Sequence, residues 1–363
     1  MPRNTRVSLG RRQFLGSLAA AGAAAGLVRT PRAKAAEELN ALVWCDHTDP
    51  ALIRPFEEAF DVRVNLKEYE GTGTALSIIE QSAPGDWDVF VIDGIDVPRA
   101  VDAGILAPLP EDALPTGDLF PELVLAEYQV RDGRTYAISE KFGYNTISYN
   151  RDRVDPADVE DMAVIWSDKY EGRIAIYDYY LPVIGLVAIG LGKKTSELTE
   201  ADLPAIREKL FAMKKVAKLV GDVVASQTAL VTGEVDILVG GGEWVTAGLA
   251  AEKPELDWLL PKQGGVRWSQ SIGIFADSTR KDLALEFVKY IVSPEGQARL
   301  ATSSCYWAMP ANRKAGEVLT PQQKAALRWD DQPGYLARAQ LYPAPDAELD
   351  AKMQDIWTEM LQQ

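Results

Sequence analysis

Acidic, aromatic and imidazole side chains gather in two short stretches of the 363-residue chain, 44–47 and 93–96, each directly after an apolar run. A carboxylate beside an aromatic ring suits a cationic group, because the ring face adds cation–π attraction to the ion pair. Asp46 and Asp93 are therefore candidates for holding a cation; the alternative is that they only make local turn bonds. Three neighbours in the same stretches are also candidate ligand contacts: Trp44, His47 and Ile95.

A second group of candidates lies in loop 177–182 and in the glycine run 240–242 that precedes an acid. Backbone N–H groups at the start of a helix can hold a carboxylate or phosphate, although a glycine run can also be a simple tight turn. Lys141 is a further possible partner for an anion, and both together would favour a zwitterionic or acidic ligand. The candidates of this group are Tyr177, Asp178, Tyr179, Gly240 and Glu243.

Most catalytic chemistries find no support in the sequence. There is one histidine, which removes mechanisms that need two imidazoles, and there is no G-x-S-x-G, H-E-x-x-H or P-loop motif. One histidine and scattered acids do not make a metal site, so neither a metal nor a cofactor is expected. A glycosidase that uses two carboxylates stays open, because acids are plentiful and the Trp and Tyr rings suit a sugar.

The only two cysteines, Cys45 and Cys305, are far apart in the sequence. An oxidising compartment would allow a bridge between them. Nothing in the sequence brings the two together, so two separate thiols is the favoured interpretation.

Strands and helices alternate along the chain, which predicts an α/β fold with a mixed, mostly parallel sheet and helices on its faces. Ligands of such sheets bind beyond the carboxyl ends of the strands, where stretches 44–47 and 93–96 lie. We expect strands at 39–44, 62–69, 88–92, 134–138, 144–150, 172–176, 235–239, 257–260 and 265–274. We expect helices at 50–60, 75–81, 97–103, 182–191, 200–220, 244–252, 281–292 and 294–302. The tail, 321–363, is expected to be helical, with Ile356, Trp357 and Leu361 on one face.

The first 35 residues differ from the rest. They carry seven basic residues and no acid, and removing that charge from the total of −15 leaves −22, which argues against a nucleic-acid partner. The pair Arg11-Arg12, a short apolar run and Ala33-x-Ala35 resemble a twin-arginine export signal with cleavage before Ala36. The alternative is a membrane anchor, but the run 15–28 is shorter than the ~20 residues that span a bilayer.

Several stretches, in order, resemble the spermidine/putrescine-binding family of extracytoplasmic solute-binding proteins of ABC importers. They are 86–91, 143–150, 166–174, 233–237, 261–268 and 294–300. The resemblance implies a two-lobed periplasmic-binding-protein fold (type II) that closes on its ligand like a hinge. It implies one lobe from 36–145 with about 270–330, a second from 146–269, and a C-terminal helical segment, 331–363, packing on the lobes.

The aromatic positions of that family are kept better than its acids. Trp44, Trp268 and Tyr306 stand at matching aromatic positions and are candidate ligand contacts. Tyr179 and Pro182 stand where the family has a carboxylate pair, although an alignment slip of one residue would bring Asp178 back. Two further departures are Gln270 in place of an aspartate and Gly240 in place of a tryptophan.

The sequence therefore favours a monomeric periplasmic receptor without catalytic activity. It would capture a small nitrogenous solute, such as a polyamine, another amine or an amino-acid-like zwitterion, and deliver it to permease subunits in the inner membrane. The alternative is an exported carbohydrate-binding protein or glycoside-active enzyme.

Overall fold

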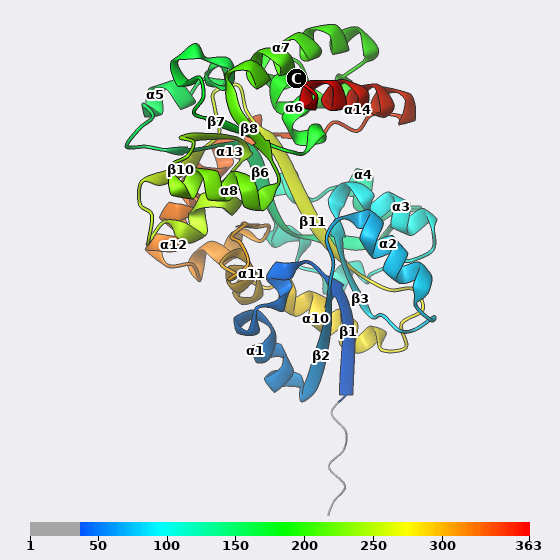
Figure 1. Ribbon diagram of the computed structural model, residues 1–363. Helices are drawn as coiled ribbons and strands as arrows, with labels where there is room; N and C mark the ends of the chain where they lie inside the picture. Colours follow the sequence, from blue (N-terminus) through cyan, green and yellow to red (C-terminus); the bar gives the residue numbers. More distant parts are fainter. Residues whose placement is uncertain (1–36) are drawn as a thin grey trace, which may run out of the picture. The chain divides into compact units, whose positions relative to one another are not determined.

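The computed structural model describes residues 37–363; the leader predicted over 1–35 lies outside this part. Its large sheet has the strand order β2-β1-β3-β11-β6-β9-β7-β8, and three short strands join it at β6 and β11. The strands at the two ends of this order belong to two lobes, one below and one above in Figure 1. The strands are β1 (Glu37–Val43), β2 (Val62–Glu68), β3 (Val89–Asp93), β4 (Val130–Arg131), β5 (Arg134–Thr135), β6 (Ala137–Asn150), β7 (Ile174–Tyr177), β8 (Ala217–Gly221), β9 (Ile237–Gly241), β10 (Leu256–Leu259), β11 (Val266–Ile274), β12 (Met309–Pro310) and β13 (Gln340–Leu341).

The first lobe contains β1, β2 and β3, which run parallel. Its first helix illustrates how local sequence sets an element. Asp49 accepts a hydrogen bond from the Ala51 backbone N–H at 2.8 Å, and Pro50 begins the helix, where a missing N–H costs nothing. The helices of this lobe are α1 (Pro50–Phe60), α2 (Thr72–Gln81), α3 (Val97–Asp102), α4 (Ala126–Gln129), α10 (Lys281–Ile291) and α11 (Pro294–Ala301).

The second lobe contains β7, β8 and β9, also parallel, with β10 paired to β6. The long helix expected over 200–220 ends earlier, because residues 217–221 form β8 beside β7. The helices here are α5 (Pro156–Val159), α6 (Tyr180–Gly190), α7 (Leu203–Val216), α8 (Val223–Thr232) and α9 (Glu243–Thr246).

Two long strands, β6 and β11, pass from one lobe into the other and pair antiparallel (Figure 1). The two strands expected at 134–138 and 144–150 are in fact mostly one, β6, because Gly143 stays extended in register with Trp268. All fourteen residues of β6 are buried. Polar groups on β6 therefore sit inside the protein and need internal partners.

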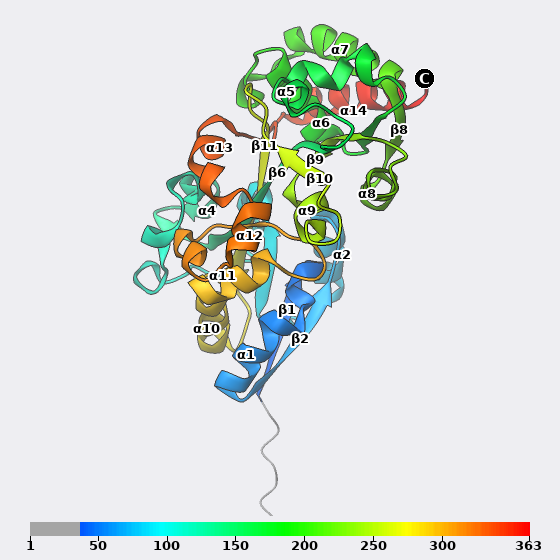
Figure 2. The same ribbon diagram turned by 90° about the vertical axis from the view of Figure 1, so that its left-hand side faces the viewer.

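The C-terminal part adds α12 (Pro321–Ala326), α13 (Gln332–Arg338) and α14 (Ala347–Leu361). Helix α14 packs on α6 and α7 of the second lobe (Figures 1 and 2). The sequence predicted Trp357 and Leu361 on the inward face of this helix. Trp357 is buried, but Leu361 is exposed, so the prediction is wrong for Leu361. Leu349, Met353 and Met360 complete the buried face, at the three- and four-residue spacing of a helix.

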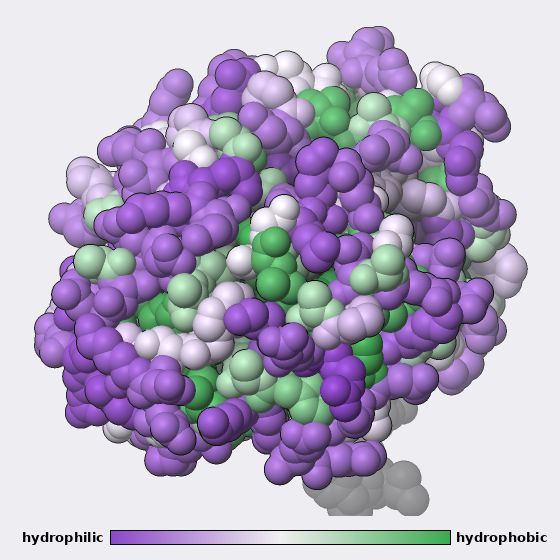
Figure 3. Space-filling view, turned by 90° about the horizontal axis from the view of Figure 1, so that it is seen from above, coloured by the Kyte–Doolittle hydropathy of each residue, from purple (hydrophilic) through white to green (hydrophobic). Residues whose placement is uncertain are grey.

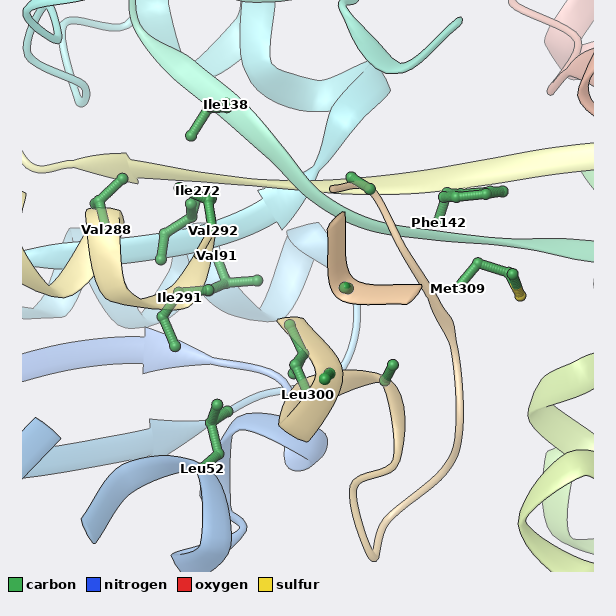
Figure 4. Close-up of a cluster of buried hydrophobic side chains, with 14 of the residues drawn as sticks. Leu52, Val91, Ile138, Phe142, Ile272, Val288, Ile291, Val292, Leu300 and Met309 are labelled. Carbon is green, nitrogen blue, oxygen red and sulfur yellow. The ribbon is translucent and has the colours of Figure 1, made fainter. Parts of the chain in front are cut away.

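Apolar side chains fill the space between the sheet and its helices. Figure 4 shows the first lobe, where Leu52 of α1, Val91 of β3 and Ile291 of α10 point into one cluster. The face of the second lobe seen from above is mostly hydrophilic, with hydrophobic residues in small separate groups (Figure 3). None of the helices described between 37 and 363 is long and apolar enough to cross a membrane.

Candidate functional site

A half-buried carboxylate ends β3. Asp93 lies directly opposite Gln270 of β11, and opposite residues of an antiparallel pair share one face of the sheet. The Nε2 of Gln270 donates a hydrogen bond to Asp93 Oδ1 at 3.3 Å. Gln270 is 3% exposed, and its Oε1 is buried without a hydrogen-bond partner among the described residues. This face therefore presents a carboxylate and an unused acceptor.

Burial raises the pKa of Asp93 to about 6, and the nearby Asp96 carboxylate adds to the rise. The Gln270 hydrogen bond and the Lys141 charge act in the opposite direction. The salt bridges found in residues 37–363 do not include Asp93. A carboxylate removed from water without a cationic partner is unfavourable in its charged form, so Asp93 is placed to receive a cation.

The charge of Asp93 acts on five tyrosines, which we call the tyrosine group. In each of them burial is the main cause of a raised pKa, and the Asp93 charge contributes to the rise. They come from both lobes and from the C-terminal part, so the surroundings of Asp93 depend on distant segments of the chain. The group consists of Tyr69, Tyr177, Tyr179, Tyr306 and Tyr342.

Several of these rings contact one another and two tryptophans. The ring centroids of Tyr177 and Tyr179 lie 6.0 Å apart, and Tyr179 is 6.0 Å from Tyr342. Tyr177 also lies 5.5 Å from Trp244, and on the first lobe Trp44 lies 5.5 Å from Tyr69. Such edge and tilted contacts hold the rings in fixed orientations. These ring contacts, together with the Asp93 charge, define an aromatic surround whose ring faces suit a cationic group.

The glycine run before α9 serves packing. Gly240 has φ +89°, and a Cβ there would lie 2.9 Å from Tyr177 Cβ, so the glycine lets Tyr177 approach. Glu243 is fully buried and accepts hydrogen bonds from the Tyr144 backbone N–H at 3.2 and 3.1 Å. Burial raises its pKa well above the usual range. The expected anion site is not supported, because an acid already occupies it and α9 has only four residues.

Trp268 remains a candidate contact. Its side chain is half-buried and lies against Gly143, where a Cβ would overlap both the indole and the Glu243 carboxyl. It lies two residues before Gln270 in β11, so both side chains project from the same face of the sheet. Trp268 is thus on the face that carries Asp93 and Gln270.

A second polar cluster follows β1, and all of its members except the half-buried Tyr306 are fully buried. His47 Nδ1 lies 3.0 Å from Asp46 Oδ1, and its Nε2 lies 2.9 Å from Glu140 Oε2. Lys141 Nζ forms a salt bridge with Asp46 Oδ2 and donates to Tyr306 Oη at 3.0 Å. We call these five residues the buried ion cluster. They are paired with one another, so Asp46 and His47 are already engaged, and Lys141 is not free for an anion as the sequence suggested.

The charges in the buried ion cluster support one another. Burial alone would raise the pKa of Asp46, but Lys141 and His47 together hold it well below its usual range. Burial alone would lower the pKa of His47, but Glu140 and Asp46 raise it to about 8. At neutral pH Asp46 is therefore a carboxylate and His47 a cation.

The expectation of two separate thiols is wrong. Cys45 and Cys305 form a disulfide with their Cα atoms 6.0 Å apart, across 260 residues of sequence. The bond ties the 3-10 helix η1 (Cys45–Thr48), which carries Asp46 and His47, to the loop that carries Tyr306. The disulfide therefore holds together two segments that contribute residues to the buried ion cluster.

Asp178 and Ile95 were expected to contact the ligand, and they lie in different surroundings. The exposed Asp178 accepts a hydrogen bond from Trp357 Nε1 of α14 at 3.0 Å, so it belongs to the α14 contact, whereas Ile95 is half-buried beside Asp93. Sequence reasoning missed Glu140 and Tyr342. A polar pair inside an apolar strand was the available signal for Glu140; Tyr342 had none.

No three His, Cys, Asp or Glu side chains are grouped as metal ligands within 37–363. A cavity of about 540 Å³ lies between residues 246–258, Trp307 and residues 322–328, and none of its lining residues belongs to the tyrosine group or the buried ion cluster. Asp93 and its aromatic surround therefore remain the arrangement best suited to a ligand.

Known proteins are similar in sequence to most of this chain. A family model described as bacterial extracellular solute-binding protein matches residues 51–328. The spermidine/putrescine-binding periplasmic protein of Salmonella typhimurium is 24% identical over 308 residues, covering 84% of this chain and 86% of that protein. The putrescine/cadaverine-binding protein of Pseudomonas aeruginosa is 23% identical over 357 residues, covering 91% and 95%.

A solved structure shows the same fold. It is the spermidine/putrescine ABC transporter substrate-binding protein of Streptococcus pneumoniae, in complex with calcium and HEPES. The TM-score is 0.77 at 20% identity, with 90% of this chain and 99% of that chain covered. The predicted two-lobed α/β fold and the family resemblance are confirmed, and the relatives are extracytoplasmic binding proteins of transport systems. The chain belongs to the family of bacterial extracellular solute-binding proteins.

Proposed function

We propose that this protein is the periplasmic substrate-binding component of an ABC importer, and that it captures a small organic amine at Asp93 and delivers it to a membrane permease. The observation that carries the proposal is the half-buried Asp93 carboxylate, which forms no salt bridge within residues 37–363 and whose charge acts on the tyrosine group. The names of the relatives, which bind spermidine, putrescine or cadaverine, support the same class of ligand.

The local chemistry suits an ammonium group. Its N–H donors would meet the Asp93 carboxylate and the Oε1 of Gln270. Within residues 37–363 the carboxylate has no cationic partner and the Oε1 has no hydrogen-bond donor. The rings around Asp93 would add cation–π attraction, worth roughly 0.5–2 kcal/mol each time a cation lies over a ring face. A neutral sugar would leave the Asp93 charge without compensation.

The crossing strands support capture by closure. Asp93 and Tyr69 belong to the first lobe, whereas Tyr177 ends β7 of the second lobe and Tyr179 lies two residues further on. Because β6 and β11 connect the lobes, a hinge motion about these strands would open and close the aromatic surround. We assign 36–145 with about 270–330 to one lobe and 146–269 to the other. The receptor acts as a monomer without catalysis.

Isothermal titration calorimetry and thermal-shift screening of the purified protein, with amines, amino acids and sugars, test this function. We expect saturable, stoichiometric binding of an amine and no product formation. Saturable binding of a sugar with no amine binding, or turnover of a glycoside, would overturn the proposal and favour the carbohydrate reading.

A further inference from the structure

Lys141, Gln270 and Asp93 lie in one row across three neighbouring strands. Gln270 of β11 is opposite Asp93 of β3 on one side and opposite Lys141 of β6 on the other. Strands are about 4.8 Å apart, so the backbones of Asp93 and Lys141 are separated by about 10 Å. The Lys141 charge reaches Asp93, since it lowers the pKa of that carboxyl.

The pairing of β6 with β11 shifts by one residue beside this row. Gln270 pairs with Lys141, and Ser271 pairs with Ser139, so Glu140 is an extra residue in β6. A bulge of this kind redirects side chains. It is consistent with Glu140 and Lys141 both reaching the buried ion cluster although they are adjacent in a strand.

The ammonium of Lys141 sits in surroundings suited to the ammonium of a ligand. It is ion-paired with Asp46, donates a hydrogen bond to the Tyr306 hydroxyl oxygen at 3.0 Å, and lies 5.1 Å from the centroid of the Tyr306 ring. All of Lys141 is buried, and Glu140 Oε1 nearby has no hydrogen-bond partner among the described residues. Carboxylate, ring face and hydroxyl together make a cation site.

We propose that Lys141 is the built-in occupant of a second cation site beside Asp93, and that it restricts the ligand to a single ammonium group. This inference rests on the proposed function. Tyr306 belongs to both groups: its hydroxyl accepts the hydrogen bond from Lys141, and the charges of Asp46, Glu140 and Asp93 all act on it. A diamine held at Asp93 and extended along the row would meet the Lys141 cation where it needs a carboxylate.

The first test removes the occupant. Lys141→Ala deletes three methylenes and the ammonium, which together correspond to n-propylammonium. We expect n-propylammonium chloride to raise the melting temperature of K141A by several degrees above sodium chloride at equal ionic strength. The matched control, Asp46→Asn with Lys141→Met, lacks the cation site and should show no such difference. Equal effects of the two salts on K141A would overturn the cation site.

The second test compares n-butylamine with 1,4-diaminobutane by calorimetry. The wild-type protein should bind the diamine no more than about threefold more tightly than the monoamine, whereas K141A should bind the diamine at least tenfold more tightly than the monoamine. A wild-type preference of tenfold or more for the diamine overturns the restriction without any variant, and so does an unchanged ratio in K141A.

The outcomes separate this inference from the proposed function. Wild-type protein that binds neither amine overturns the proposed function together with the restriction on its ligand. The n-propylammonium rescue of K141A needs no natural ligand, so it still decides whether Lys141 fills a cation site. Amine binding with a strong diamine preference overturns only the inference.

Discussion

Gln270 donates a hydrogen bond to the Asp93 carboxylate at 3.3 Å, while its own carbonyl oxygen is buried without a partner among residues 37–363. A buried acceptor without a donor costs about 1–3 kcal/mol. One ammonium group placed between these two residues would satisfy the acceptor and pair the carboxylate at once. The arrangement explains why a site with so few charges can still select a cation.

Asp93→Asn should weaken amine binding by about 10- to 100-fold. The change keeps the shape of the side chain but removes the charge, and a charged hydrogen bond is worth about 1.5–3 kcal/mol. Calorimetry with the best-binding amine measures the effect. Asp178→Asn is the matched control, because Asp178 is exposed and contacts α14. Equal affinities of the wild type and D93N would remove Asp93 from the site.

Amine affinity should fall as the pH drops through 6. The pKa of Asp93 is raised to about 6 in the free protein, and an ammonium favours the ionised carboxylate. Binding is therefore strongest above this pH and weakens towards tenfold per pH unit well below it. The amine itself stays protonated throughout, as a lysine side chain does. Dissociation constants measured from pH 5 to 7.5 test this, and D93N should give a flat profile.

The buried ion cluster should make stability depend on pH in the alkaline direction. The pKa of His47 rises from 6.5 to about 8 on folding, so its contribution is complete below pH 6.5 and is lost as the pH rises through 8. The loss amounts to about 2 kcal/mol. Denaturant unfolding at pH 6 and pH 9 measures it, and His47→Gln should remove the difference. The same slope in H47Q would assign the effect to other groups.

Removal of the disulfide should destabilise the protein by about 3–5 kcal/mol, because the bond closes a loop of 260 residues that is otherwise free in the unfolded chain. The double variant Cys45→Ser, Cys305→Ser measures this by denaturant unfolding. A dithiol reductant should lower the stability of the wild type and leave the double variant unchanged. Two reactive thiols in the unfolded, unreduced wild type would contradict the bond.

Trp268→Ala should weaken amine binding by about 1–3 kcal/mol through lost ring contact. The indole is half-buried on the face that carries Gln270. Calorimetry measures the change, and unfolding curves verify that the variant is folded. An unchanged affinity in a folded variant would place Trp268 outside the site.

Local patterns predicted the elements whose causes are local. The bounds of α1 agree at both ends, because Asp49 caps it, Pro50 begins it and Leu52 and Phe56 face inward. The end of α7 was wrong, because residues 217–221 satisfy their backbone by pairing with β7. That pairing depends on the tertiary fold and leaves no periodic signal.

The site was predictable only in part, for the same reason. Asp93 follows from its place at the end of a strand, which sequence reasoning can locate. The engagement of Asp46 depends on Lys141, 95 residues later, and the disulfide partner of Cys45 is 260 residues away. Such pairings are set by how distant strands and loops meet, so the sequence around each residue does not reveal them.

The most direct test is a crystal structure of the purified protein with its best-binding amine. We expect an amine nitrogen within about 3 Å of Asp93 and of Gln270 Oε1, as a charged hydrogen bond requires, with Lys141 still paired to Asp46. An amine bound away from Asp93, or a ligand whose nitrogen makes no contact with that carboxylate, would contradict the account.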